Sequence, residues 1–126
     1  KEGLAAALQT RLEAVESRAG LQTSFHTQGE NLLTPLVEGE FYRIAQEALN
    51  NVIKHAKAEH VSIELNCTGS TCAMTIADDG IGFDIASAQT NGGVGLRSIA
   101  ERAKHIHARL TLESTPNQGS KLRVEV

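Results

Sequence analysis

The chain has 126 residues, a formal net charge of −3 and an ordinary hydrophobic share of 40%. That length suits a single domain over 1–126 with a core of its own, and no apolar run approaches the roughly 20 residues of a membrane span. Lysine and arginine are scattered, so we expect no nucleic-acid partner. No signal peptide is visible, which predicts a cytoplasmic domain without direct membrane contact. Because the sequence starts at Lys1 and its one methionine is Met74, we interpret it as a fragment of a longer protein or as a processed product.

Apolar residues three and four apart predict an amphipathic helix at the start of the chain, with Gly20 placed to end it. Its apolar stripe consists of Leu4, Leu8, Leu12, Val15 and Ala19. Residues 21–27 then alternate apolar and polar side chains, which indicates a half-buried strand. Pro35 can open a second helix, and this helix should run to about Lys57.

The second helix is expected to carry two different faces. Its core stripe consists of Phe41, Ile44, Ala45, Ala48, Leu49, Val52 and Ile53. The opposite side follows an i+4 spacing with two neighbours: Arg43, Glu47, Asn51 and His55, with Asn50 and Lys54 beside them. A carboxylate one turn before a carboxamide, next to basic groups, suggests metal and phosphate. The alternative is a surface ion pair of Arg43 with Glu47, worth only about 0 to 1 kcal/mol, beside solvated asparagines.

Two alternating stretches, 61–67 and 72–78, flank a short polar turn and predict a β-hairpin. In the register that keeps one face apolar, three pairs lie opposite each other: Cys67 with Cys72, Leu65 with Met74, and Ile63 with Ile76. The same register could bring the two sulfurs close, but the cysteines are expected to be reduced, buried thiols rather than a disulfide, because cytosolic thiols stay reduced. Their spacing lacks the further ligands of a zinc site.

Residues 94–107 predict a third helix, and 110–112 and 122–126 predict two more strands. The residues expected to point inward from this helix are Leu96, Ile99, Ala100 and Ala103. A doubly wound parallel sheet would have strands that are apolar on both faces, whereas every strand here has a polar face. We therefore predict an α+β fold, a two-layer sandwich with a mixed, mostly antiparallel sheet of about five strands and about three helices on one face.

Residues 78–83 read Asp-Asp-Gly-Ile-Gly-Phe and begin where a strand should end. Glycines permit positive φ and the close approach of a ligand. Asp78, the last strand residue, can direct its carboxylate at a donor such as an adenine amino group. An ordinary Asp-Gly turn would give the same local pattern.

Residues 92–97 read Gly-Gly-Val-Gly-Leu-Arg and lead into the third helix. Small residues at a helix N-terminus expose amide N–H groups, which suit phosphate. Arg97 could add positive charge or simply be solvated. The segment has neither the third glycine of a Rossmann fingerprint nor the Gly-Lys-Ser/Thr of a P-loop.

The ordered set Glu-x-x-x-Asn, Asp-x-Gly-x-Gly and Gly-x-Gly-Leu resembles the GHKL superfamily of ATPases, which have the Bergerat fold. The residues at 42–51, 54–56, 78–83 and 99–102 look closely like the catalytic domain of sensor histidine kinases, in the branch of the nitrate and desaturase sensors. The resemblance covers essentially the whole chain.

By that resemblance, Asn51 holds the Mg²⁺ that bridges the phosphates of ATP, and Glu47 polarises a metal-bound water or acts as a base. Asp78 binds adenine, and Lys54 contacts phosphate. The remaining cofactor-binding positions that the resemblance implies are Gly80, Gly82, Gly93, Gly95, Leu96 and His55. Oxygen ligands from one amide and one carboxylate suit Mg²⁺, which commonly binds through one or two protein groups plus phosphates.

The resemblance also implies partners. The γ-phosphoryl group would pass to a histidine on a separate dimerisation domain, and from there to a response regulator. None of the five histidines in this chain has the setting of that acceptor, so we expect the ATP-binding half alone. The alternatives are a serine kinase of the anti-sigma type, which shares the nucleotide fold, and a degenerate nucleotide domain used as an interaction module.

Overall fold

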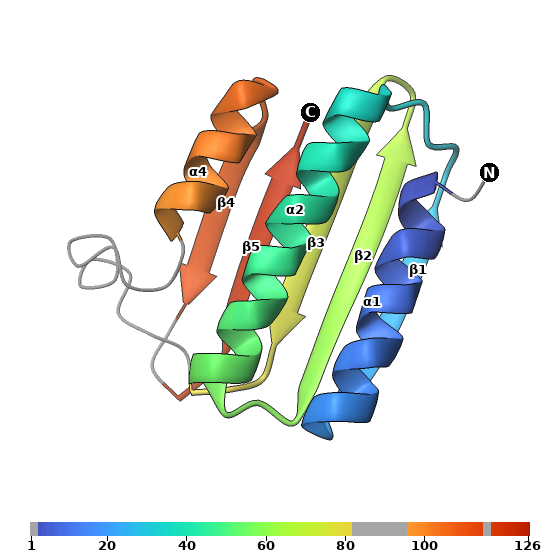
Figure 1. Cartoon of the computed structure of the whole chain (residues 1–126). Helices are drawn as coiled ribbons and strands as arrows, with labels where there is room; N and C mark the ends of the chain where they lie inside the picture. Colours follow the sequence, from blue (N-terminus) through green and yellow to red (C-terminus); the bar gives the residue numbers. More distant parts are fainter. Residues whose placement is uncertain (1–2, 82–95, 115–116) are drawn as a thin grey trace.

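A computed structural model describes residues 3–81, 96–114 and 117–126, apart from the side chains of His55 and Ala56. Figure 1 shows the elements in their sequence colours. In chain order they are α1 (Gly3–Ala19), β1 (Gln22–Gln28), α2 (Pro35–Asn51), the π-helix η1 (Val52–Ala56), β2 (His60–Thr68), β3 (Thr71–Asp78), α4 (Leu96–His105), β4 (Arg109–Ser114) and β5 (Ser120–Glu125).

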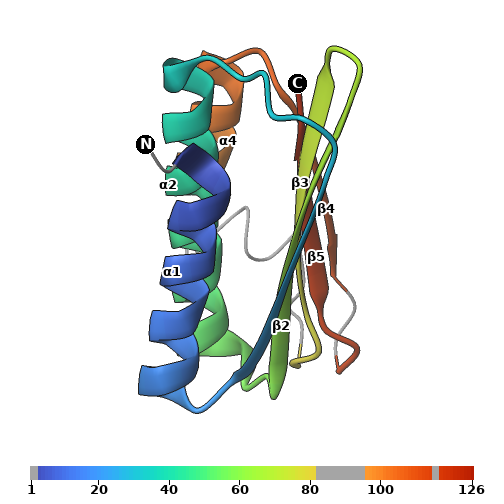
Figure 2. The ribbon, with the colours of Figure 1, turned by 90° about the vertical axis from the view of Figure 1, so that its right-hand side faces the viewer.

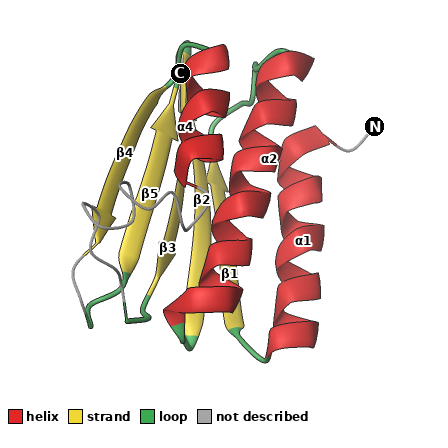
Figure 3. Cartoon of the chain, turned by 60° about the vertical axis from the view of Figure 1, so that its left-hand side comes forward, coloured by secondary structure: helices red, strands yellow, loops and turns green. Residues whose placement is uncertain are grey.

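The strands form one five-stranded sheet in the order β1-β2-β3-β5-β4. β1 pairs with β2 in parallel, and the other three pairings are antiparallel. The helices α1, α2 and α4 all pack on one face of this sheet (Figures 2 and 3). The predicted two-layer α+β sandwich with a mixed, mostly antiparallel sheet is therefore confirmed. Among the described residues, every helix is too short or too polar to span a bilayer.

The hydrophobic core lies between the helix layer and the sheet. Side chains from both layers are completely buried, among them Leu8, Leu12, Phe41, Ile44, Ile63, Met74 and Val124. Fully burying a large apolar side chain stabilises the fold by about 1.5 to 3 kcal/mol. Most of the predicted stripe residues belong to this core, so the helical periodicity identified the buried face of each helix.

Three alanine or isoleucine positions of the predicted stripes are wrong. Ala19 is exposed because it is the last residue of α1. Ala100 is exposed because the buried stripe of α4 is narrower than predicted and contains only the other three predicted residues, Leu96, Ile99 and Ala103. Ile53 is 46% exposed. It lies in η1, where i→i+5 hydrogen bonding changes the residues per turn and breaks the stripe.

The ends of α2 follow from its sequence. The Thr34 side chain accepts a hydrogen bond from the N–H of Val37 at 3.3 Å, and Pro35 occupies the first turn, as caps of this kind prefer. At the other end the helix widens into η1, and Lys57 ends it with a φ of 51°. The predicted extent to about Lys57 is confirmed, with a π-helical last turn directly after Asn51.

The β2–β3 hairpin has the predicted register, with Leu65 opposite Met74 and Ile63 opposite Ile76. The expectation of reduced thiols is wrong for this structure, because Cys67 and Cys72 form a disulfide with an S–S distance of 2.04 Å. The register itself explains the bond. It places the two cysteines directly opposite each other, with Cα atoms 4.1 Å apart and both side chains on the buried face.

Candidate functional site

The predicted metal and adenine residues lie at the same end of the molecule. Glu47 and Asn51 stand one turn apart on α2, and both are partly buried. Asp78 is the last residue of β3. Figure 1 shows that α2 and β3 end at the same, lower edge, one in the helix layer and one in the sheet. The fold therefore brings two motifs that are distant in sequence to one edge.

Among the described residues, two donors hold the carboxylate of Asp78 in place. Its Oδ1 accepts the N–H of Gly80 at 2.8 Å, and its Oδ2 accepts the hydroxyl of Ser120 at 2.5 Å. Ser120 lies directly opposite Asp78 in the β3–β5 register. An ionised carboxylate has about four acceptor sites, so acceptor capacity remains for a ligand amino group. The sequence did not single out Ser120 as a partner of Asp78, since only the strand pairing brings the two together.

The neighbouring Asp79 makes contacts within the fold. Its Oδ1 accepts the backbone N–H groups of Glu59 and His60, both at 2.9 Å, and its Oδ2 lies 2.7 Å from His60 Nδ1. The backbone and side-chain hydrogen bonds from His60 lower the pKa of Asp79 to about 2. Asp79 thus ties the end of β3 to the start of β2. Asp79 is therefore occupied by contacts within the fold, whereas Asp78 is the acid that the sequence predicts to bind a ligand.

The alternative interpretation of the polar face of α2 loses support. Of the ion pairs between residues that the structure describes, none joins Arg43 to Glu47. A solvated surface pair therefore does not account for Glu47. The π-helix that follows Asn51 agrees with a functional role, since π-turns inside α-helices are frequent at functional sites.

Some of the remaining predicted positions lie among the described residues, and others do not. Leu96 is the first residue of α4 and is buried, Gly80 is buried, and Lys54 is exposed in η1. The Arg97 side chain is 86% exposed, and among the described residues its Nε lies 3.8 Å from a carboxylate oxygen of Glu101. Four predicted positions lie outside what the structure describes: Gly82, Gly93, Gly95 and the side chain of His55.

Residues 37–126 match the family described as histidine kinase-, DNA gyrase B- and HSP90-like ATPases. The chain belongs to this ATPase family. The predicted resemblance to the GHKL superfamily is thereby confirmed.

Several relatives of this ATPase-family domain are sensor histidine kinases. It is 34% identical to an uncharacterized sensor-like histidine kinase of Chloroflexus aurantiacus, over 99% of this chain and 22% of that protein. It is 28% identical to the oxygen sensor histidine kinase NreB of Staphylococcus carnosus, over 98% of this chain and 36% of that protein. The chain thus spans about a fifth to a third of these relatives, and NreB is consistent with the predicted branch.

Solved structures confirm the fold of the ATPase-family domain. The catalytic domain of histidine kinase ThkA aligns with a TM-score of 0.77 at 14% identity, covering 98% of this chain and 88% of that one. The histidine kinase domain of the blue-light activated kinase EL346 from Erythrobacter litoralis aligns with a TM-score of 0.75 at 20% identity, covering 98% and 64%. The expected Bergerat fold is therefore confirmed.

The depressed pKa of Asp79 predicts how the ATPase-family domain responds to acid. The contribution of the ionised carboxylate to stability is complete above the ordinary pKa of 3.8 and is lost as the pH falls through the folded value of about 2. We expect a loss of about 1 kcal/mol between pH 4 and pH 2, since the side chain is 48% exposed and solvent screens it.

Asp79→Asn should flatten this part of the stability curve, measured by urea unfolding at a series of pH values. Wild type and variant share Glu40, whose pKa is also lowered, so their difference isolates Asp79. Parallel curves for the two proteins would contradict the assignment.

Proposed function

We propose that this domain binds Mg-ATP and donates the γ-phosphoryl group to a histidine on a separate dimerisation domain of a two-component sensor kinase. The observation that carries the proposal is that α2 and β3 bring Glu47, Asn51 and Asp78 to one edge of the molecule. Membership of an ATPase family and similarity to sensor histidine kinases support it.

The oxygen-bearing side chains of Glu47 and Asn51 on α2 suit Mg²⁺. The Asn51 carboxamide and the nearby Glu47 carboxylate offer oxygen atoms, which this ion prefers, and Mg²⁺ needs few protein ligands when phosphates complete its shell. Asn51 would hold the ion, which neutralises charge on the phosphates when bound. Glu47 would orient a water molecule or accept a proton. Lys54, exposed in η1, would contact phosphate.

Asp78, the residue expected to bind adenine, belongs to β3 of the sheet. Asp78 would accept a hydrogen bond from the adenine amino group with the acceptor sites that Gly80 and Ser120 leave. The other positions implied by the family motifs stay expectations for nucleotide binding: Gly80, Gly82, Gly93, Gly95, Leu96 and His55. Phosphoryl transfer needs positioning and charge neutralisation more than covalent chemistry, so the domain would supply a cradle for the nucleotide.

The partners follow from the reaction. The acceptor histidine would stand on a dimerisation domain, and a response regulator would receive the phosphoryl group from it. The sensor histidine kinases among the relatives favour this over an anti-sigma type serine kinase. They also favour it over a degenerate interaction module.

The test is nucleotide binding by wild type and two neighbouring variants. Mg-ATP should stabilise the native state by about 2.7 kcal/mol at a hundredfold excess over Kd, because a ligand selective for that state shifts unfolding. Asp78→Asn should weaken binding about tenfold or more, since a charge-assisted hydrogen bond is worth about 1.5 to 3 kcal/mol.

Asp79→Asn is the matched control, because that carboxylate is already committed to Glu59 and His60. Its affinity for Mg-ATP should equal that of wild type in calorimetric titrations at neutral pH. If millimolar Mg-ATP leaves both the melting temperature and the calorimeter unchanged for wild type, the proposed function is wrong. Equal affinities for wild type and Asp78→Asn would move adenine recognition to another residue.

A further inference from the structure

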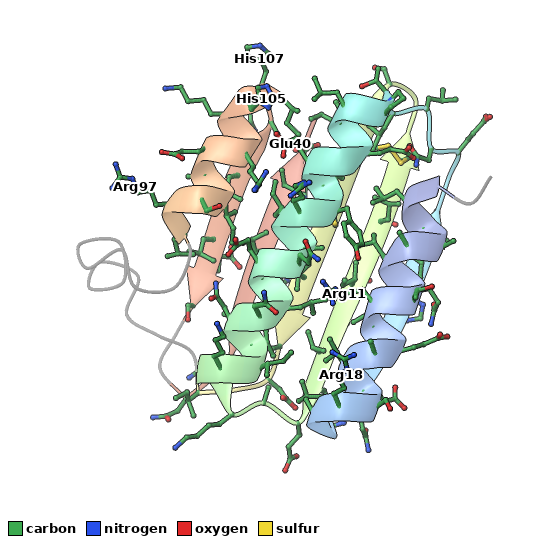
Figure 4. The ribbon with its side chains drawn as sticks, in the orientation of Figure 1. Arg11, Arg18, Glu40, Arg97, His105 and His107 are labelled. Carbon is green, nitrogen blue, oxygen red and sulfur yellow. A yellow bond between two sulfur atoms is a disulfide. The ribbon has the colours of Figure 1, made fainter. Side chains whose placement is uncertain are left out.

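One acidic side chain lies inside the helix layer, away from the predicted site residues. Of the residues that the structure describes, Glu40 on α2 is the one buried charged side chain, at 9% exposure. Its Oε1 accepts a hydrogen bond from Arg102 Nη1 at 3.0 Å, and its Oε2 lies 2.6 Å from His105 Nδ1. Figure 4 shows Glu40 and His105 close together between α2 and α4.

The cluster of Glu40, Arg102 and His105 attaches α4 to α2. A carboxylate this deeply buried is tolerated only when it is paired and hydrogen-bonded, and the hydrogen bond from His105 is the main cause that lowers its pKa. The Arg102 guanidinium also relies on Glu40. Its Nη1 donates to Glu40, whereas its Nε is buried with no hydrogen-bond partner among the described residues. Removing Glu40 would take from Arg102 this ion-pair partner and from α4 this polar attachment.

The place of the cluster along α2 connects it to the candidate site. Glu40, Glu47 and Asn51 are seven and four residues apart, so they follow one side of the helix. α4 runs antiparallel to α2 (Figure 1). Its C-terminal end meets Glu40, and its N-terminal end points along α2 in the direction of Glu47 and Asn51. The cluster therefore holds the C-terminal end of α4 against α2, while Leu96 and Ile99 pack the N-terminal half of α4 into the core.

We propose that Glu40 is a positioning residue that fixes α4 against α2, so that the N-terminal end of α4 stands in register with Glu47 and Asn51 at the phosphate end of the nucleotide. This inference rests on the proposed function. It separates two halves of the site, because Asp78 is held by Gly80 and by Ser120 of the sheet. The phosphate end should depend on Glu40, and the adenine end should not.

The test compares two ligands on one variant. Glu40→Gln removes the charge but keeps the shape of the side chain. The Kd for Mg-ATP should rise about threefold to thirtyfold, the range expected for residues that couple to a site without touching the ligand. The Kd for adenosine, measured by NMR titration on the same sample, should change less than about twofold. Rescue is expected with Glu40→Asp, which restores the negative charge and should recover most of the Mg-ATP affinity.

The matched control is Glu101→Gln. It also removes a carboxylate beside an arginine of α4, but that pair is exposed, with side chains 71% and 86% accessible. Its Kd for Mg-ATP should equal that of wild type. If Glu40→Gln does not fold, His105→Ala takes its place, since the His105 side chain is 60% exposed and its loss should raise the Kd for Mg-ATP in the same selective way.

Different results would overturn the proposed function and the positioning role of Glu40. A wild type that binds no Mg-ATP would overturn the proposed function and with it the role of Glu40. A wild type that binds Mg-ATP, with unchanged affinity in Glu40→Gln and in His105→Ala, would overturn the positioning role alone. An equal rise in the Kd values for Mg-ATP and for adenosine would also overturn it, because it would show that the cluster acts on general stability.

Discussion

Asn51→Ala is expected to abolish Mg²⁺-dependent phosphorylation of an acceptor-histidine domain that is supplied by fusion, while metal-free ADP binding largely survives. Metal placement serves the transferring phosphoryl group more than the adenine, so its loss should damage the chemistry more than the affinity. Glu47→Gln should keep Mg-ATP bound and slow the transfer. Transfer of label from γ-labelled ATP, measured beside ADP titrations, checks both expectations.

Asn50→Ala is the matched control, because Asn50 is the exposed neighbour of Asn51 on α2 and is not assigned to the metal. It should transfer label at the wild-type rate. The chain alone, without the acceptor domain, should not label itself. Full transfer by Asn51→Ala, or stable self-labelling on any of the five histidines, would overturn this division of labour.

The parts of the fold that the sequence predicted are those that local patterning determines. The apolar stripe of α2, from Phe41 to Leu49, is buried because a 3.6-residue period keeps it on one face. The hairpin register followed because a shift by one residue would have placed Ile63 and Met74 in water. Ile53 was misplaced because the change from α- to π-helix has no simple signal in residue hydrophobicity.

The contacts that the sequence could not predict join residues far apart in the chain. Glu40 has the polarity of a surface residue, and its burial depends on Arg102 and His105, which are more than 60 positions away. Ser120 contacts Asp78 only because β5 pairs with β3. For the candidate site, local motifs predicted Asp78 and the Glu47–Asn51 pair, whereas the contact of Ser120 with Asp78 required the sheet topology.

Gly119 shows most clearly how β5 approaches the candidate adenine residue. Its φ of +86° is a conformation that side chains rarely adopt, and a Cβ built on it would lie 2.2 Å from the backbone oxygen of Asp78. Only glycine allows β5 to start this close to the end of β3. The same approach places Ser120, the next residue, against the Asp78 carboxylate.

Gly119→Ala should therefore destabilise the domain by about 3 kcal/mol or more, from positive-φ strain and from overpacking against backbone that cannot move aside cheaply. It should also weaken Mg-ATP binding, since relieving the contact moves Ser120 away from Asp78. Gly69→Ala is the matched control: Gly69 has a φ of +61° in the β2–β3 turn, but an added Cβ meets nothing within 4 Å, so only about 1 to 2 kcal/mol of strain is expected. Urea unfolding of both variants measures the difference, and equal losses of stability would mean that the contact with Asp78 has no energetic weight.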